Sequence, residues 1–186
     1  MDLILSNGYP DDMVGLVSNR TTYREPLLMF ENRGGLFHNV SAESGPVFQK
    51  MFTARGLAVG DFDNDGYLDV LVCNNGEAPI LLHNEGNHKN HWVGVQLVPT
   101  TSNAASVGAI LTWTAGGVTR KRQKTGGGSF LSSHDPREIL GMGAATKMDS
   151  IDVRWPSGQT DHVQAPPIDS YIRIVEGKGM VPPANH

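Results

Sequence analysis

Short apolar runs, each closed by turn-forming residues, recur along the chain. In the second half they occupy residues 92–98, 107–114, 118–124, 151–155 and 171–175. Each run is bounded by Gly, Pro, Asn or Ser, as expected for the strands of a sandwich or barrel. The pattern predicts an all-β protein whose second half is a small β-sandwich or barrel-like domain.

The first half contains an internal repeat. Residues 2–8 (DLILSNG) match residues 69–76 (DVLVCNNG), and residues 28–32 (LMFEN) parallel residues 80–84 (ILLHN). Each copy of the first motif is an acidic residue, an apolar strand and an Asn/Gly turn. The offset of the second pair is close to the roughly 40 to 50 residues of a propeller blade. Because the first copy lacks the acidic loop that precedes the second, the repeat predicts incomplete β-propeller blades.

Composition and charge narrow the class of protein. The 186 residues include 22 Gly and 11 Pro, which suits short strands joined by tight turns. A net charge of -4, from 15 basic and 19 acidic side chains, provides no field for holding nucleic acid. Cys73 is the single cysteine, so an intramolecular disulfide and a cysteine-based zinc site are both excluded. No apolar stretch reaches the roughly 18 residues of a membrane span, and the first residues do not resemble a signal peptide.

These patterns predict two domains and a tail. Residues 1–90 are expected to hold the partial blades, residues 91–177 the second β domain, and residues 178–186 a frayed tail. The polar stretch 85–90 (EGNHKN) suits a linker or a long turn between the domains.

The clearest candidate site is an acidic loop in the first half. Residues 60–69 read GDFDNDGYLD, which places Asp61, Asp63, Asp65 and Asp69 at loop positions 1, 3, 5 and 9. Calcium takes six to eight hard oxygen donors, and alternate residues of a curled loop direct several carboxylates to one centre. Gly at position 6 permits the curl, and the Tyr67 carbonyl is expected to turn inward as a backbone ligand. The sequence therefore predicts a Ca²⁺ site.

The loop differs from an EF-hand. An EF-hand begins in the same way but needs a bidentate Glu at position 12, where this chain has Val72 within an apolar strand. Four carboxylates in nine residues repel one another unless a cation neutralises them, so metal binding is expected to order the loop. The alternative is a solvated acidic turn without metal.

Three histidines crowd the end of the first half. His83, His88 and His91 lie near Glu85, and neutral imidazoles bind transition metals. Their spacing fits no common ligand pattern, so we interpret them as exposed linker side chains.

One basic cluster lies in the run 118–124. On a strand, Arg120, Arg122 and Lys124 share a face and Lys121 lies on the other. Such a face either binds a polyanion, for example an acidic glycan, or protects a solvated edge strand by its charge, and we favour the edge strand. The tryptophans are expected in the core rather than on a sugar-stacking surface: Trp92, Trp113 and Trp155.

No catalytic set stands out. Ser133, His134 and Asp135 are the residue types of a hydrolase triad, but adjacent residues cannot link nucleophile, base and orienting carboxylate. Lys124 precedes the glycines 126–128, whereas a phosphate-binding loop has its Lys after them. The sequence favours a protein without enzymatic activity.

At family level, residues 58–72 resemble an FG-GAP/VCBS repeat, the calcium-binding blade motif of integrin-type β-propellers. The rest resembles the ASPIC and UnbV domain, on the motifs at residues 90–92 (NHW), 106–109 (SVGA), 126–132 (GGGSFLS), 134–136 (HDP) and 153–158 (VRWPSG). Proteins with this pairing, including the cartilage acidic protein group, usually carry a complete propeller before this domain and a secretion signal ahead of both. The resemblance therefore implies an extracellular or cell-surface location and a chain that is a C-terminal fragment.

The leading functional hypothesis is a calcium-stabilised extracellular binding or adhesion module that recognises a protein or glycan surface. An accessory protein or enzyme of secondary metabolism is the alternative, because UnbV-type proteins are named from enediyne biosynthetic clusters. A third hypothesis is a subunit of a larger assembly, in which neighbouring copies pair at open sheet edges.

Overall fold

The computed structural model describes residues 2–86 and 89–182. Within them every regular element is a strand, apart from the short 3-10 helices η1 (Val14–Leu16) and η2 (Pro46–Gln49). This confirms the predicted all-β class. Two compact units form: the first holds the residues up to Val59, Val70–Leu82 and Ser129–Ser132, and the second holds Gly60–Asp69, His83–Gly128 and the residues from Ser133 onward.

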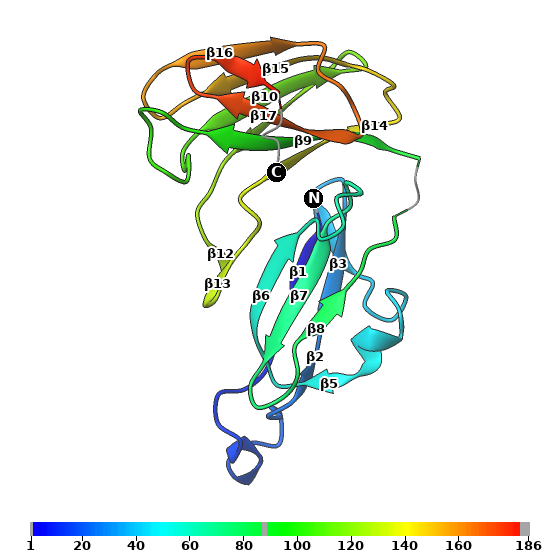
Figure 1. The fold of residues 1–186 in the computed structure, drawn as a ribbon. Helices are drawn as coiled ribbons and strands as arrows, with labels where there is room; N and C mark the ends of the chain where they lie inside the picture. The colour runs from blue at the N-terminus through cyan, green and yellow to red at the C-terminus, as the bar shows by residue number, and fades with distance from the viewer. Residues whose placement is uncertain (1, 87–88, 183–186) are drawn as a thin grey trace. The chain divides into compact units, whose positions relative to one another are not determined.

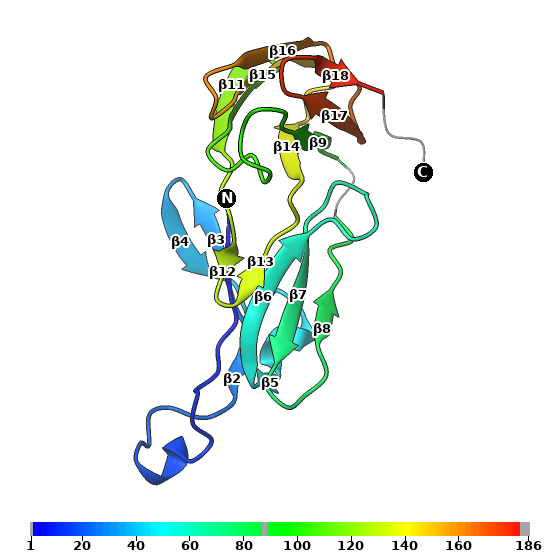
Figure 2. The same ribbon diagram turned by 60° about the vertical axis from the view of Figure 1, so that its left-hand side comes forward.

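The strands of the first half form three small open sheets, in the orders β1-β3-β4, β2-β5 and β6-β7-β8. Figures 1 and 2 show β6, β7 and β8 side by side. Their bounds are β1 (Leu3–Leu5), β2 (Glu25–Pro26), β3 (Leu28–Arg33), β4 (Leu36–Asn39), β5 (Met51–Phe52), β6 (Ala54–Gly60), β7 (Asp69–Asn74) and β8 (Ile80–Leu82). Each apolar run of the internal repeat therefore becomes a strand.

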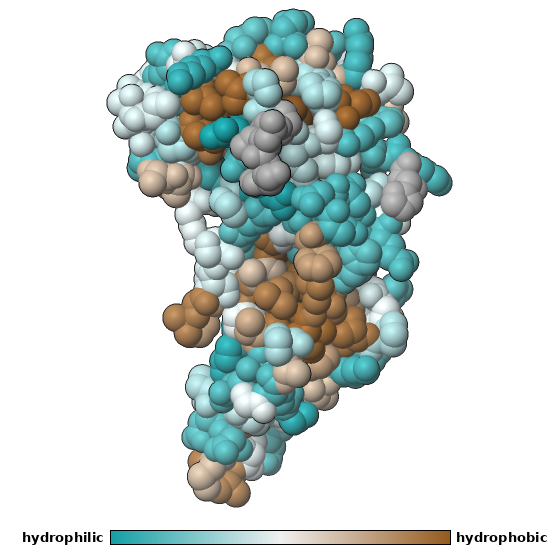
Figure 3. Space-filling view, viewed as in Figure 1, coloured by the Kyte–Doolittle hydropathy of each residue, from teal (hydrophilic) through white to brown (hydrophobic). Residues whose placement is uncertain are grey.

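The sheet β6-β7-β8 is apolar on both faces. Its inner face contributes to a hydrophobic core made of Leu27, Phe48, Ala54, Leu57 and Val72. On the other face Leu71 pairs with Leu81 across the ladder, and they are 41% and 46% exposed. Figure 3 shows a hydrophobic area over β7 and β8. A strand that is apolar on both faces is typical of sheets covered on both sides.

The second unit is a sandwich of two four-stranded sheets, in the orders β11-β10-β15-β16 and β14-β9-β17-β18 (Figure 1). Its strands are β9 (His91–Val98), β10 (Ile110–Ala115), β11 (Val118–Gln123), β14 (Glu138–Gly143), β15 (Met148–Arg154), β16 (Thr160–Gln164), β17 (Ser170–Val175) and β18 (Gly179–Val181). The short strands β12 (Gly128–Ser129) and β13 (Ser132–Ser133) form a separate hairpin. All pairings in the sandwich are antiparallel except that of β9 with β17, which is parallel.

Alternation along the strands builds the sandwich core. On β10, Leu111, Trp113 and Ala115 are buried and the residues between them are partly exposed. They join one hydrophobic cluster with side chains from both sheets, including Val95 of β9 and Ile174 of β17. The three tryptophans are all buried, as the sequence predicts.

Three strands of the two four-stranded sheets do not appear among the predicted runs. β14 is interrupted by glycines, and β16 contains a single strongly apolar residue, Val163, so neither has a long apolar pattern. β18 pairs with β17 within a segment that the sequence analysis expects to be a frayed tail. Residues 183–186 of that tail lie outside the described residues. These strands form because a neighbouring strand supplies their backbone hydrogen bonds.

A buried carboxylate fastens the end of β17 to a loop after β9. Oε2 of Glu176 accepts the backbone N–H groups of Thr100, Thr101 and Ser102 at 2.8, 2.8 and 2.9 Å. Oε1 accepts the hydroxyls of Ser102 and Ser157. Burial by itself would raise the pKa of Glu176, but these hydrogen bonds outweigh it and hold the pKa far below the ordinary value of 4.5.

The free energy of unfolding should therefore decrease as the pH is lowered, because Glu176 becomes protonated. Its folded-state pKa is lowered, so its contribution is present above the unfolded-state value near 4.5 and is lost as the pH falls below it. The measurement is urea unfolding followed by tryptophan fluorescence, in EDTA, at a series of pH values from neutral downward. Glu176→Gln should weaken the acid dependence, whereas Glu85→Gln, at an exposed site, should not. An identical pH profile for wild type and Glu176→Gln would contradict the assignment.

Candidate metal centre

The acidic loop, Gly60–Asp69, connects β6 to β7 and belongs to the second unit. Two of its residues adopt left-handed backbone conformations, Asn64 with φ 63° and Gly66 with φ 86°. Asn and Gly tolerate this region better than other residues, so the sequence allows two sharp reversals within a few residues. The reversals curl the chain around its own carboxylates.

Asp61 anchors the curl from inside. It is only 2% exposed, and its Oδ1 accepts the N–H of Asp65 at 3.1 Å while its Oδ2 accepts the N–H of Gly66 at 2.9 Å. The Asp65 carboxylate in turn accepts the N–H of Tyr67 at 2.8 Å. A tight loop would leave these backbone N–H groups without hydrogen-bond partners. The carboxylates of Asp61 and Asp65 accept them instead.

Asp69 closes the loop from the start of β7. Its Oδ2 accepts the N–H of Phe62 at 2.9 Å and its Oδ1 accepts the N–H of Asn84 at 2.8 Å. It is as buried as Asp61. A carboxylate has about four acceptor positions, so one backbone hydrogen bond to each oxygen leaves capacity for a cation.

The loop brings its carboxylates together in two overlapping groups. Ligand atoms of Asp61, Asp63 and Asp69 lie within 4.8 Å of one another, and so do those of Asp63, Asp65 and His83. Calcium–oxygen bonds are about 2.3 to 2.6 Å long, so ligands on opposite sides of one ion are separated by roughly 5 Å. The residues present therefore fit a metal ion. Each of the four predicted aspartates belongs to at least one of the two groups.

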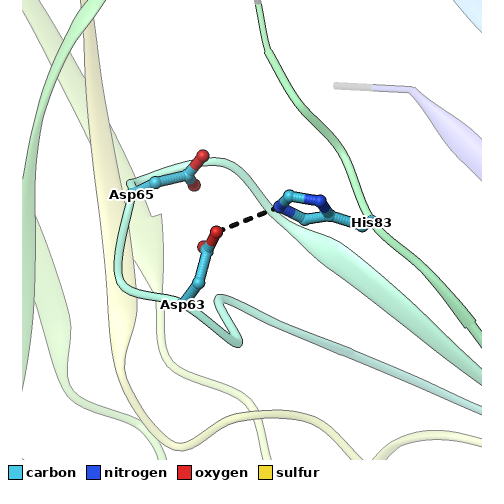
Figure 4. Close-up of side chains that lie close together, drawn as sticks. All are labelled: Asp63, Asp65 and His83. Carbon is cyan, nitrogen blue, oxygen red and sulfur yellow. Dashed lines mark hydrogen bonds and ion pairs between the residues drawn. The ribbon is translucent and has the colours of Figure 1, made fainter.

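His83 joins one of these groups, although its place in the sequence indicates an exposed linker side chain. Figure 4 shows its imidazole facing Asp63, with Nε2 3.0 Å from Oδ2. The other clustered histidines differ from it: His91 pairs with Asp169 through Nδ1 at 2.7 Å, and His88 lies outside the described residues. The internal repeat carries a signal for this site. Its motif at residues 80–84 ends in His83 and Asn84, and the Asn84 N–H donates to the carboxylate of Asp69.

Side chains of the sandwich hold the loop in place. The Tyr171 hydroxyl, on β17, donates to Oδ2 of Asp61 at 2.6 Å. Arg137 donates from Nη2 to the Asp61 carbonyl at 2.8 Å and from Nη1 to Oδ1 of Asn64 at 2.5 Å. Trp92 of β9 lies against Gly66, where a Cβ atom would come within 2.0 Å of Cε2. The sequence predicts none of these contacts, which come from three residues of the sandwich.

Burial and the hydrogen bonds around the loop shift the pKa values of three residues of the sandwich. Burial raises the pKa of Tyr171, and its hydrogen bond to Asp61 raises it further, so the hydroxyl keeps the proton that it donates. Burial alone would raise the pKa of Asp135, but the hydrogen bonds and charge of Arg137 lower it below its ordinary value. The bond to Asp135 raises the pKa of Arg137. Arg137 and Asp135 therefore remain a charged pair.

The basic cluster is largely used within the sandwich. β11 is an edge strand, as expected for a charge-protected edge. Arg122 pairs with Glu138 at 3.3 Å, and the buried Lys124 pairs with the same carboxylate at 3.4 Å. Two of the three cations on the shared face are thus engaged, which disfavours a polyanion site.

Comparison with known families agrees with this architecture. The family model for the FG-GAP-like repeat matches residues 5–72 and 61–110, and the model for ASPIC and UnbV matches residues 99–181. Because the FG-GAP matches together span more than half of the chain, this chain belongs to the FG-GAP-like repeat family. The predicted order of the two families is confirmed. A search among curated proteins found no match.

The two families set the general class of function. Together they suggest a binding module of the extracellular type, and FG-GAP repeats often bind calcium. Across residues 2–86 and 89–182, no helix has the length and apolar character required to cross a bilayer.

The contact between Gly66 and Trp92 yields a test. Gly66→Ala should lower the free energy of unfolding more than Gly143→Ala does. Both glycines have positive φ, and an L-residue there costs about 1 to 2 kcal/mol, but only the new methyl at Gly66 collides with a side chain. The collision should cost about 1 to 3 kcal/mol more. Denaturant unfolding measures the difference, and equal losses in the two variants would show that the loop does not rest on Trp92.

Proposed function

We propose that the chain is a calcium-stabilised extracellular binding module without catalytic activity of its own. The observation that carries this proposal is the convergence of carboxylate oxygens from Asp61, Asp63 and Asp69 within 4.8 Å. The FG-GAP-like repeat match over the same residues supports it.

Calcium is the ion that the donor set favours. The proposed ligands are hard oxygens: the carboxylates of Asp61, Asp63, Asp65 and Asp69 and the carbonyl of Tyr67. His83 contacts Asp63 from the side, and its role with calcium is to orient that carboxylate rather than to bind the ion. An imidazole nitrogen suits transition metals better than calcium.

The proposed role of the ion is structural. Asp61 and Asp69 already accept hydrogen bonds from the loop backbone, so an ion held by the same carboxylates would fix the course of the chain between β6 and β7. Metal bound by a folded loop adds its binding free energy to folding. The ion would therefore support a surface rather than activate a substrate.

The proposed partner is a protein or glycan surface. The exposed pair Leu71 and Leu81 on the first unit supports a protein partner, because apolar area left open on a sheet face is typical of interaction sites. The Asp135 carboxylate is engaged by Arg137 at 2.6 Å, which argues against Ser133, His134 and Asp135 acting as a hydrolytic triad.

Calcium dependence is the direct test of this proposal. At a free calcium concentration of about 100 times Kd, one bound ion adds about 2.7 kcal/mol to folding. In a chain of this size that corresponds to a rise in Tm of roughly 5 to 10 °C. Differential scanning calorimetry in calcium and in EDTA measures the shift, which should be absent when Asp63→Asn and Asp65→Asn are combined.

The matched control is Asp149→Asn, which removes a half-exposed carboxylate of β15, on the sandwich. This variant should keep the full calcium shift. A wild-type protein whose Tm is the same in calcium and in EDTA would contradict the proposal.

A further inference from the structure

Three residues from separate segments of the sandwich contact the acidic loop. Tyr171 comes from β17, Trp92 from β9, and Arg137 from the segment just before β14. The loop residues group with these strands in the second unit. A loop that only joined β6 to β7 would not need such partners.

Tyr171 acts on a candidate ligand itself. Its hydroxyl donates to Oδ2 of Asp61 at 2.6 Å, and Asp61 is one of the three aspartates whose oxygens converge. A neutral donor on one carboxylate oxygen fixes the orientation of the carboxylate without neutralising its charge.

Arg137 acts on the backbone of the same turn. Its guanidinium donates to the Asp61 carbonyl and to the Asn64 side chain, and it lies over the Tyr171 ring at 4.2 Å from the ring centroid. It thus holds the start and the middle of the loop together. The stacking of the guanidinium on the ring in turn keeps the Tyr171 hydroxyl within hydrogen-bond distance of Asp61.

The positive charge of Arg137 would repel a cation if it were unpaired. It is paired: Asp135 accepts from Nε at 2.9 Å and from Nη2 at 2.6 Å. The ion pair contributes no net charge, so the loop keeps the negative field of its own aspartates. This arrangement lets an arginine position a cation site without opposing the cation.

From these contacts we propose that Tyr171 and Arg137 are positioning residues for the cation site, and that divalent ion binding stabilises the sandwich that carries them. This inference rests on the calcium binding proposed above. Coupling follows from linkage: if a folded sandwich preorganises the loop for the ion, the bound ion stabilises the folded sandwich by the same free energy. The binding site and the ASPIC and UnbV domain then form one cooperative unit.

The test combines two independent readouts on the full chain. Isothermal titration with CaCl₂ gives the calcium affinity. Tryptophan fluorescence during urea unfolding reports on the sandwich, because Trp92, Trp113 and Trp155 all lie in the second unit. Wild-type protein should bind calcium and should shift its fluorescence-detected unfolding midpoint to higher urea when calcium is added.

Tyr171→Phe removes one hydroxyl and keeps the ring. It should weaken calcium binding by about tenfold or more, because a hydrogen bond that orients a charged ligand is lost. It should also reduce the calcium-induced shift of the sandwich midpoint. The matched control is Tyr23→Phe, which removes a hydroxyl bonded to Asn75 in the first unit and should change neither readout. Arg137→Lys, which keeps the charge but loses the fork, should behave like Tyr171→Phe.

The outcomes separate the two proposals. If wild-type protein binds no calcium in the titration, both the proposed function and this inference are wrong. If it binds calcium but the fluorescence-detected midpoint does not move, the calcium site stands and the coupling is refuted. Unchanged affinity in both Tyr171→Phe and Arg137→Lys would likewise refute the positioning role and leave the calcium site intact.

Discussion

Mutual repulsion among four aspartates confined to nine residues is the constraint on which this structure depends. Like charges so close together favour an open, solvated turn unless something compensates for them. The loop compensates in part by directing backbone N–H groups at Asp61 and Asp69, and by placing His83 beside Asp63. A cation completes this compensation in the proposed function, which is why the ion is assigned to architecture rather than to catalysis.

The same constraint accounts for what surrounds the loop. A turn rich in negative charge gains from fixed donors, and the sandwich supplies two of them, the Tyr171 hydroxyl and the Arg137 guanidinium. Arg137 in turn needs Asp135 to cancel its charge. Trp92 packs where Gly66 leaves room. The negative charge of the loop is thus partly compensated by hydrogen bonds from residues of the β-sandwich that lie far from the loop in the sequence.

Local patterns were readable from the sequence, and long-range contacts were not. The aspartate spacing identifies the loop, and short apolar runs bounded by turn residues identify strands such as β9 and β10, because both signals lie within a few consecutive residues. β16 has no apolar run that would predict a strand, because Val163 is its single strongly apolar side chain. Tyr171 meets Asp61 across 110 positions, a pairing that no local pattern encodes. His83 was visible but was interpreted as a linker residue, because only the fold brings it to Asp63.

The most direct test of a cation held against the sandwich is terbium luminescence. Tb³⁺ occupies calcium sites and emits when a nearby tryptophan is excited, and Trp92 is the tryptophan that lies against Gly66 of the loop. Excitation of the wild-type protein should give terbium emission that added calcium suppresses. Trp92→Phe should abolish most of that emission, while Trp113→Phe should retain it. Absence of sensitised emission, or emission that persists in Trp92→Phe, would contradict the account.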